Sequence, residues 1–123
     1  MKAIGLDIGT TTISAVVMEQ RTRFAVQTCT VANQSFLKTA RSWEKLQDAS
    51  VILKQAKELL DQLLDVADDI CVIGLTGQMH GIVYLDRNGA CISPLYTWED
   101  ERAEQKCFAS RSLCQLLKEQ YGV

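Results

Sequence analysis

The segment Ile70–Leu75 is an uninterrupted run of apolar and small residues without polar alternation. Such a run is typical of a β-strand that is covered on both faces, as strands are in the centre of a parallel sheet. Asp68 and Asp69 precede the run and separate it from a segment with helical periodicity. We therefore expect a central, parallel strand at residues 70–75, preceded by a helix.

The helix is indicated by apolar residues that recur at steps of four, three, four and three. They are Ile52, Ala56, Leu59, Leu63 and Val66. This spacing places all five on one face of an amphipathic helix. Asp48 or Ser50 is expected to cap its N-terminus. The residues before it, Ala32–Gln47, show no period, so we expect a loop that is functional or wraps around the surface.

Three further strands are expected near the N-terminus. The segments Ala3–Ile8, Ile13–Met18 and Phe24–Val31 are rich in apolar and β-branched residues. Gly9–Thr12 and Glu19–Arg23 are short polar links between them. Three consecutive strands with short links predict an antiparallel meander.

The second half of the chain is expected to contain a hairpin and a helical segment. Gly81–Leu85 and Cys91–Ile92 flank Asp86–Gly89, and the Asn-Gly pair in that link favours the positive φ angles of a tight turn. From Trp98 to Gln120 the composition favours a helix, with a break near Ser110–Ser112.

Composition and charge exclude several classes of protein. With 123 residues, 47% of them hydrophobic, the chain can bury the core of one domain. Its net charge of -2 and the absence of a basic block argue against a nucleic-acid partner. No apolar run is long enough for a membrane span or a secretory signal. Five widely spaced cysteines without a Cys-x-x-Cys pair are typical of the reducing cytoplasm.

The first link between strands has the chemistry of a phosphate-binding turn. Gly9 allows close backbone approach, free N–H groups and the hydroxyls of Thr10, Thr11 and Thr12 can donate to phosphate oxygens, and Asp7 can hold a hydrated cation. It is not a P-loop, because no Gly-Lys-Ser/Thr follows and the segment leads into a strand. The alternative from these residues alone is a plain hairpin in which Asp7 is a solvated turn residue.

A second group of polar residues follows the expected central strand. Gln78, Met79 and His80 lie between glycines at the carboxyl end of that strand, where ligands bind in α/β sheets. Gln and His offer the neutral donors and acceptors that sugar hydroxyls require. We expect a polyol site, although a single histidine is more often a structural hydrogen-bonding residue.

The third group lies where the last helical segment is expected to begin. Trp98 can present a flat apolar face to a sugar ring. Asp100 and Arg102 can either bind hydroxyls or pair with one another. Glu99 and Glu101 are interpreted as acids that complement the dipole of a helix N-terminus.

Taken in order, these three groups resemble the FGGY family of carbohydrate kinases, members of the actin-like, ribonuclease H-fold superfamily. Leu6–Thr11 is similar to the family's opening phosphate motif, and Gly74–Gly81 to its sugar-site strand and loop. Pro94–Arg102 is similar to the segment that places a tryptophan and an acid beside the sugar. The resemblance implies an incomplete α/β ribonuclease H-like (actin-like ATPase) fold. Residues 1–123 would form part of one N-terminal domain, without its later half or the C-terminal domain.

The resemblance also implies ATP and Mg²⁺ as cofactors and a ketose as substrate. Asp7 would lie near the metal and Gly9–Thr12 near phosphate, while the sugar would contact Gln78, Met79, His80, Trp98 and Asp100. Gln-Met-His-Gly is the form of xylulokinase-like and sedoheptulokinase-like members, and Thr-Trp-Glu-Asp favours the latter. The catalytic base is expected beyond Val123, so the chain alone is expected to be inactive. We also expect the Asp7 and His80 loops to face each other across one cleft.

The resemblance leaves further expectations open. The ribonuclease H pattern has a fifth strand that this chain does not supply, so the outer edge of the strand at residues 70–75 would be unpaired and prone to self-association. One alternative function is a non-catalytic sugar-binding or assembly module. Another actin-fold ATPase, such as a chaperone or filament protein, would leave Gln-Met-His-Gly unexplained.

Overall fold

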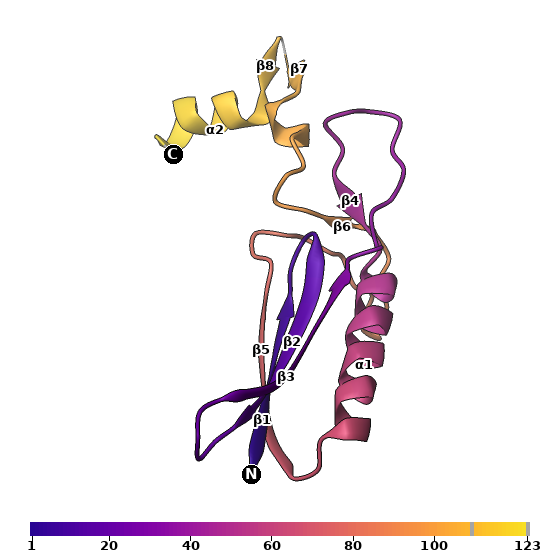
Figure 1. Cartoon of the computed structure of the whole chain (residues 1–123). Helices are drawn as coiled ribbons and strands as arrows, with labels where there is room; N and C mark the ends of the chain where they lie inside the picture. Colours follow the sequence, from indigo (N-terminus) through magenta and orange to yellow (C-terminus); the bar gives the residue numbers. More distant parts are fainter. Residues whose placement is uncertain (109, 123) are drawn as a thin grey trace.

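The computed structural model describes residues 1–108 and 110–122, without the side chains of Val66 and Phe108. Its main sheet has the strand order β3-β2-β1-β5 (Figure 1). The strands are β1 (Lys2–Ile8), β2 (Thr12–Glu19), β3 (Ala25–Ala32) and β5 (Ile70–Gly77). The first three are antiparallel neighbours, and β5 pairs parallel to β1. The predicted meander with an added parallel strand is confirmed.

Helix α1 (Ala49–Val66) lies along one face of the sheet and forms the core with it (Figure 1). Asp48 is the N-cap, as one of the two expected caps, and its Oδ1 accepts a hydrogen bond from the Ser50 backbone N at 2.8 Å. Alternate residues of β1 and β2 meet one stripe of the helix. The buried core consists of Ile4, Leu6, Ile13, Ala15, Val17, Ile52, Ala56, Leu59, Leu63 and Ala67. The predicted position Val66 lies outside the described side chains.

The prediction that β5 is covered on both faces is wrong. Every residue of β5 except Ile70 is exposed, and Leu75 is 71% exposed. Within the described residues β5 is an edge strand, paired only with β1, and no helix covers the sheet face opposite α1 (Figure 1). The apolar run of β5 indicates a strand that favours burial, but the described helices and strands do not bury it.

The segment between β3 and α1 is a loop, as predicted, with one short strand at its end. That strand, β4 (Leu46–Gln47), pairs antiparallel with β6 (Leu95–Tyr96). The pairing connects the loop to the chain that follows the sheet and places both at the end of the sheet where β1 and β5 terminate (Figure 1). The loop thus brings Gln47 to the region of the candidate site.

The predicted turn at Asp86–Gly89 is present, but its flanks are not strands. Gly89 has φ 82°, and the Asp86 carboxylate accepts hydrogen bonds from the backbone N–H groups of Asn88 and Ala90 at 2.8 and 2.9 Å. Between the flanking segments, Leu85 and Cys91 form an isolated bridge, and the Ile92 backbone N donates to the Tyr84 carbonyl oxygen at 2.9 Å. The hairpin is therefore held by its turn and by backbone hydrogen bonds that do not extend into regular strands.

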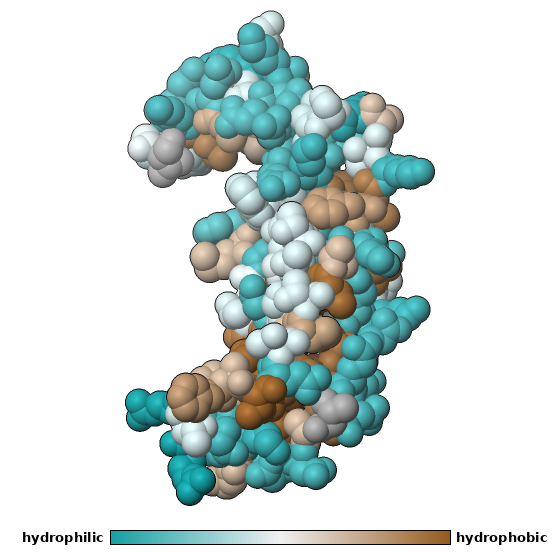
Figure 2. All heavy atoms as spheres, in the orientation of Figure 1, coloured by the Kyte–Doolittle hydropathy of each residue, from teal (hydrophilic) through white to brown (hydrophobic). Residues whose placement is uncertain are grey.

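The prediction of a helix over Trp98–Gln120 is wrong for its first half. The segment contains the 3₁₀-helix η1 (Arg102–Glu104), the short strands β7 (Lys106–Phe108) and β8 (Arg111–Ser112), and then α2 (Leu113–Tyr121). A capping box between Ser112 and Gln115 begins α2. These elements lie beyond the end of the sheet and carry mainly hydrophilic residues on the side seen in Figure 2.

In the described ranges, no helix has both the length and the hydropathy needed to cross a membrane.

Candidate functional site

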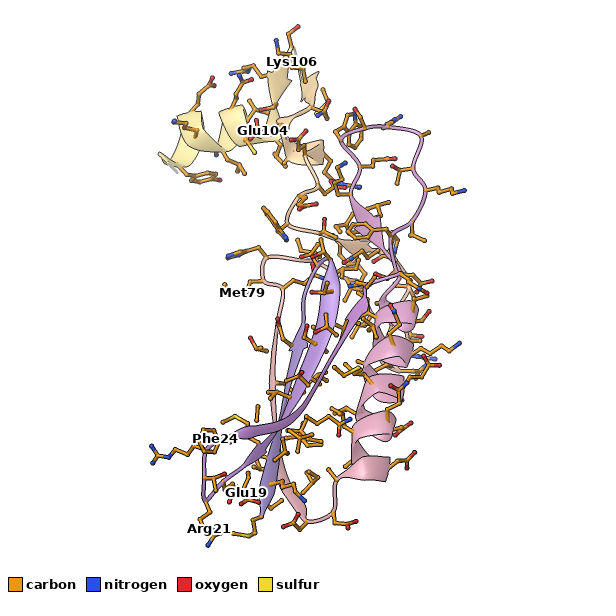
Figure 3. All side chains as sticks on the ribbon, viewed as in Figure 1. Glu19, Arg21, Phe24, Met79, Glu104 and Lys106 are labelled. Atoms are coloured by element: carbon orange, nitrogen blue, oxygen red, sulfur yellow. The ribbon has the colours of Figure 1, made fainter. Side chains whose placement is uncertain are left out.

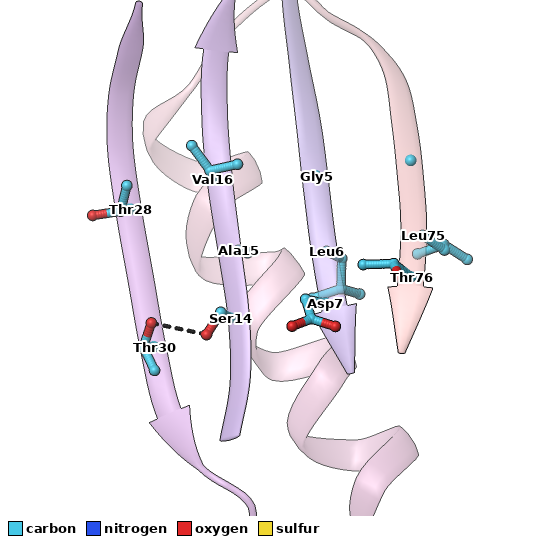
Figure 4. A pocket seen from close by; sticks show the side chains of 11 residues that line it. Gly5, Leu6, Asp7, Ser14, Ala15, Val16, Thr28, Thr30, Leu75 and Thr76 are labelled. Carbon is cyan, nitrogen blue, oxygen red and sulfur yellow. Dashed lines mark hydrogen bonds between the residues drawn. The ribbon is translucent and has the colours of Figure 1, made fainter. Parts of the chain in front are cut away.

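The turn between β1 and β2 has the features of a phosphate-binding loop. The Asp7 side chain is exposed on the sheet face away from α1, because its neighbours in β1 alternate toward the helix (Figure 4). In the described residues, the backbone N–H groups of Gly9, Thr10 and Thr11 have no protein acceptor. A Cβ at Gly9 would lie 2.8 Å from the Thr12 carbonyl oxygen, so the turn requires glycine. The loop therefore offers free donors beside a carboxylate.

The loop after β5 lies against the end of β1. The Gln78 backbone N donates to the Ile8 carbonyl oxygen at 2.9 Å, and a Cβ at Gly77 would lie 2.8 Å from that same oxygen. His80 has φ 60°, a strained value for a residue with a side chain and one that is found at functional sites. Met79 is 70% exposed and lies at the outer side of the loop (Figure 3).

A chain of hydrogen bonds connects the two loops. Thr10 Oγ1 donates to Gln78 Oε1 at 3.1 Å. The indole Nε1 of Trp98 donates to Thr10 Oγ1, also at 3.1 Å. The structure therefore brings together one residue from each of the three groups that the sequence indicated.

Sequence reasoning missed two buried amides that support this arrangement. Gln47 is fully buried; its Nε2 donates to the Thr10 carbonyl oxygen at 2.8 Å, and its Oε1 accepts from Gln78 Nε2 at 2.8 Å. Asn33 Nδ2 donates to the Gly9 carbonyl oxygen at 3.0 Å. Both lie within the segment that was interpreted only as a loop. The segment carries no local signal that distinguishes these two amides from its other polar residues.

Asp7 and His80 do not line the same hollow. Asp7 lines a hollow of about 500 Å³ on the uncovered sheet face, together with Ser14 and Thr30 (Figure 4). His80 lines another, of about 390 Å³, beside the first turn of α1. Thr76 lines both hollows. The expected common cleft between Asp7 and His80 is therefore not found. The two loops instead contact each other through the hydrogen bond between Thr10 and Gln78.

Asp100 pairs with Arg102, which was one of the two alternatives for it. Its carboxylate is 3% exposed and accepts from Arg102 Nε at 2.6 Å and from the Lys45 backbone N at 3.0 Å. The Arg102 guanidinium, partly opposed by desolvation, lowers the pKa of Asp100. Arg102 also lies over the Tyr96 ring, 4.1 Å from its centroid. This cluster holds the segment containing Trp98 against the β4 loop.

The donors around Asp7 suit a hydrated magnesium ion held jointly with phosphate. Mg²⁺ keeps several water ligands and is usually bound by one or two carboxylates plus phosphate oxygens. Asp7 supplies one exposed carboxylate beside the free N–H groups of the turn. Across the part of the chain that the structure describes, no three His, Cys, Asp or Glu side chains form a metal-binding group. An all-protein metal centre is therefore not the arrangement that these residues offer.

Known proteins share this sequence pattern. Residues 2–120 match the N-terminal domain of the FGGY family of carbohydrate kinases. The chain is 32% identical over 107 residues to a xylulose kinase of Escherichia coli, an alignment covering 85% of this chain and 21% of that protein. It is 31% identical over 109 residues to a glycerol kinase of Acinetobacter baylyi, with the same coverage of 85% and 21%. The chain spans about a fifth of the length of these curated relatives.

The fold is shared as well. A xylulose kinase structure from Lactobacillus acidophilus matches 97% of this chain and 22% of its own with a TM-score of 0.80, at 22% sequence identity. This similarity identifies the sheet and α1 as part of a ribonuclease H-like, actin-like ATPase fold. The predicted α/β fold class is confirmed.

Proposed function

The chain belongs to the FGGY family of carbohydrate kinases through their N-terminal domain, and on this premise we propose that it supplies phosphate-binding and sugar-binding loops to an ATP-dependent ketose kinase. The contact between the two loops, made by Thr10 and Gln78, carries the proposal. A kinase must hold the phosphate tail and the acceptor hydroxyl close together. In this chain a loop with free N–H donors lies beside a loop with amide and imidazole groups.

The proposed roles follow from the chemistry of each loop. Bound ATP would supply the phosphoryl group, with Mg²⁺ neutralising its charge. Asp7 holds the hydrated cation, and Gly9–Thr12 donates to phosphate oxygens. Gln78 and His80 bind sugar hydroxyls, and Met79 and Trp98 offer apolar surfaces to the carbon skeleton.

A ketose is favoured over glycerol as the acceptor. Gln78 and His80 offer several donors and acceptors in one loop, which suits a polyol with many hydroxyls. Trp98 adds a flat ring face, 57% exposed, of the kind that stacks on a sugar. Xylulose and sedoheptulose are both candidates. The Asp100 carboxylate already accepts hydrogen bonds from Arg102 and the Lys45 backbone N. We therefore propose that Asp100 contributes to the sugar site by positioning neighbouring residues.

The activity of the whole enzyme requires groups that we do not assign to this chain. No residue is proposed as catalytic base, and we propose that residues 1–123, part of one N-terminal domain, do not catalyse transfer by themselves. We further propose a cytoplasmic location, supported by five free cysteines.

Titration of the ¹⁵N-labelled chain by NMR tests the proposal. Magnesium-ATP is expected to shift the amide signals of Gly9–Thr12, and D-xylulose or sedoheptulose those of Gly77–Gly81 and the Trp98 indole. Glycerol at the same concentration is the control and is expected to cause smaller shifts. Larger shifts with glycerol than with both ketoses would reject the substrate class. The absence of shifts with every ligand would reject the proposed binding sites.

A further inference from the structure

The contacts among Thr10, Gln47 and Gln78 form a closed ring of hydrogen bonds. Gln47 Nε2 donates to the Thr10 carbonyl oxygen, Gln78 Nε2 donates to Gln47 Oε1, and Thr10 Oγ1 donates to Gln78 Oε1, at 2.8, 2.8 and 3.1 Å. The ring begins and ends on Thr10, and Gln47 within it is fully buried. The ring therefore connects the phosphate loop to the sugar loop, and the Gln47 side chain within it is shielded from solvent.

The direction of every bond in the ring is determined by its chemistry. A backbone carbonyl can only accept, so Gln47 must turn its NH₂ group to Thr10 and its oxygen to Gln78. Gln78 must then turn its NH₂ group to Gln47 and its oxygen to Thr10. The indole N–H of Trp98 can only donate, so Thr10 Oγ1 accepts from it and uses its own proton for Gln78.

The single hydroxyl proton of Thr10 is thus committed to the sugar loop. A phosphate oxygen is an acceptor. A phosphate that binds Thr10 Oγ1 must therefore replace Gln78 Oε1 as the acceptor of this hydrogen bond. Gln78 Oε1 then lacks a donor inside the protein, and an unsatisfied acceptor is costly. A sugar hydroxyl is a donor that can replace the one that was lost.

We propose that the Thr10 hydroxyl couples the two ligand sites, with Gln47 as the positioning residue that holds the Gln78 amide in the required orientation. Binding of a phosphate tail frees Gln78 Oε1 for a sugar hydroxyl, so each ligand strengthens the binding of the other. Gln78 Oε1 has a second lone pair, so sugar still binds without nucleotide, but less tightly. This inference rests on the proposed function and adds the sign of the coupling.

The coupling is measured as the ratio of two dissociation constants for D-xylulose, without and with saturating magnesium adenylyl imidodiphosphate, by NMR titration of the chain. Because binding free energies are reciprocal, the same ratio must appear when the nucleotide analogue is titrated with and without sugar. We expect a ratio of about 5 to 10 for the wild-type chain. Thr10→Val, which keeps the shape of the side chain and removes the hydroxyl, is expected to reduce the ratio to one. Thr10→Ser is expected to retain it.

Gln47→Met tests the positioning residue, with Gln55→Met as the matched control. Gln55 Nε2 donates to the Ala32 carbonyl oxygen at 2.9 Å and its Oε1 accepts from the Gln34 backbone N at 3.0 Å, so it makes the same kinds of bond without touching either loop. Both variants should lose stability, but only Gln47→Met should reduce the ratio to one. A merely structural role of Gln47 would weaken both affinities and leave their ratio unchanged.

The outcomes separate this inference from the function on which it rests. If the wild-type chain binds both ligands with a ratio of one, or if Thr10→Val keeps the wild-type ratio, the coupling is rejected and the proposed function stands. If the wild-type chain binds neither ligand, the proposed function is rejected and the coupling with it.

Discussion

The indole Nε1 of Trp98 donates to Thr10 Oγ1 at 3.1 Å, although 88 residues separate them in the sequence. Thr10 lies in the turn between the first two strands, whereas Trp98 follows the short strand β6. The bond determines which side of the Thr10 hydroxyl remains available, because an indole N–H can only donate. It also keeps the Trp98 ring, 57% exposed, beside the candidate sugar loop.

Trp98→Phe is expected to lower the free energy of unfolding by about 1 kcal/mol, because it removes this hydrogen bond and keeps an aromatic ring. Urea denaturation measures the change. Trp43→Phe is the matched control, since Trp43 stacks with Arg41 and not with the Thr10 turn. Equal losses in the two variants would contradict a specific role of the Trp98 N–H.

Gly9→Ala is expected to destabilise the chain by about 1 to 3 kcal/mol, because the added Cβ would lie 2.8 Å from the Thr12 carbonyl oxygen. Gly74→Ala is the control in the same sheet, where a Cβ would meet its nearest atom, the Ile4 carbonyl oxygen, at 4.0 Å. Thermal denaturation of both variants measures the difference. A Gly74→Ala variant as unstable as Gly9→Ala would show that close approach at the turn is not the cause.

The sequence predicted β1, β2, β3 and α1 well because their signals are local. The alternation of Ile4 and Leu6 with smaller or polar neighbours, and the period of Ile52 to Leu63, directly reflect which side chains meet in the core. The exposure of Leu75 could not be predicted from such a local pattern. Burial of a strand depends on what covers it, and its own residues do not report that.

Long-range hydrogen bonds explain the other errors. Helix propensity after Trp98 is overridden because the Asp100 carboxylate binds Lys45 N and Arg102. These contacts hold the chain in a single turn before η1, in which the Asp100 backbone N donates to the Thr97 carbonyl oxygen at 3.1 Å. Gln47 was missed because its partners, Thr10 and Gln78, lie 37 and 31 residues away. Nothing in the segment around Gln47 marks it as a contact between two distant loops.

Asp100→Asn is expected to reduce stability by about 1 kcal/mol at neutral pH, through loss of its ion pair with the partly exposed Arg102. Arg102 lowers the pKa of Asp100 in the folded chain. The carboxylate therefore contributes its full stability above the ordinary pKa of about 3.9 and loses it as the pH falls toward the lowered value. Urea denaturation at a series of pH values should show the difference between wild type and variant shrinking below about pH 4. A difference that stays constant with pH would exclude this pair as its source.

The two loops are expected to affect different kinetic constants in a longer kinase that contains this chain. His80→Ala removes a contact to sugar and should raise the KM for the ketose by about 2 to 10-fold with a small change in kcat. Asp7→Ala should lower kcat by about a hundredfold or more, because the cation held beside the phosphates is misplaced. Steady-state kinetics with varied ketose distinguishes the two. The reverse pattern would contradict the assigned roles.

The open edge of β5 is expected to make the chain self-associate. Val72 is 50% exposed and Leu75 71% exposed, on a strand that has one hydrogen-bonding neighbour within the described sheet. Unpaired N–H and C=O groups beside apolar side chains favour pairing with a second strand, and a lysine at such an edge opposes it.

Sedimentation velocity at increasing concentration should therefore show a growing average mass for the wild-type chain and a smaller increase for Leu75→Lys. Leu64→Lys, at a position on α1 that is 45% exposed, is the matched control and should associate like wild type. A wild-type chain that stays monomeric at high concentration would rule out association through this edge, and an equal effect of both lysines would indicate general charge repulsion instead.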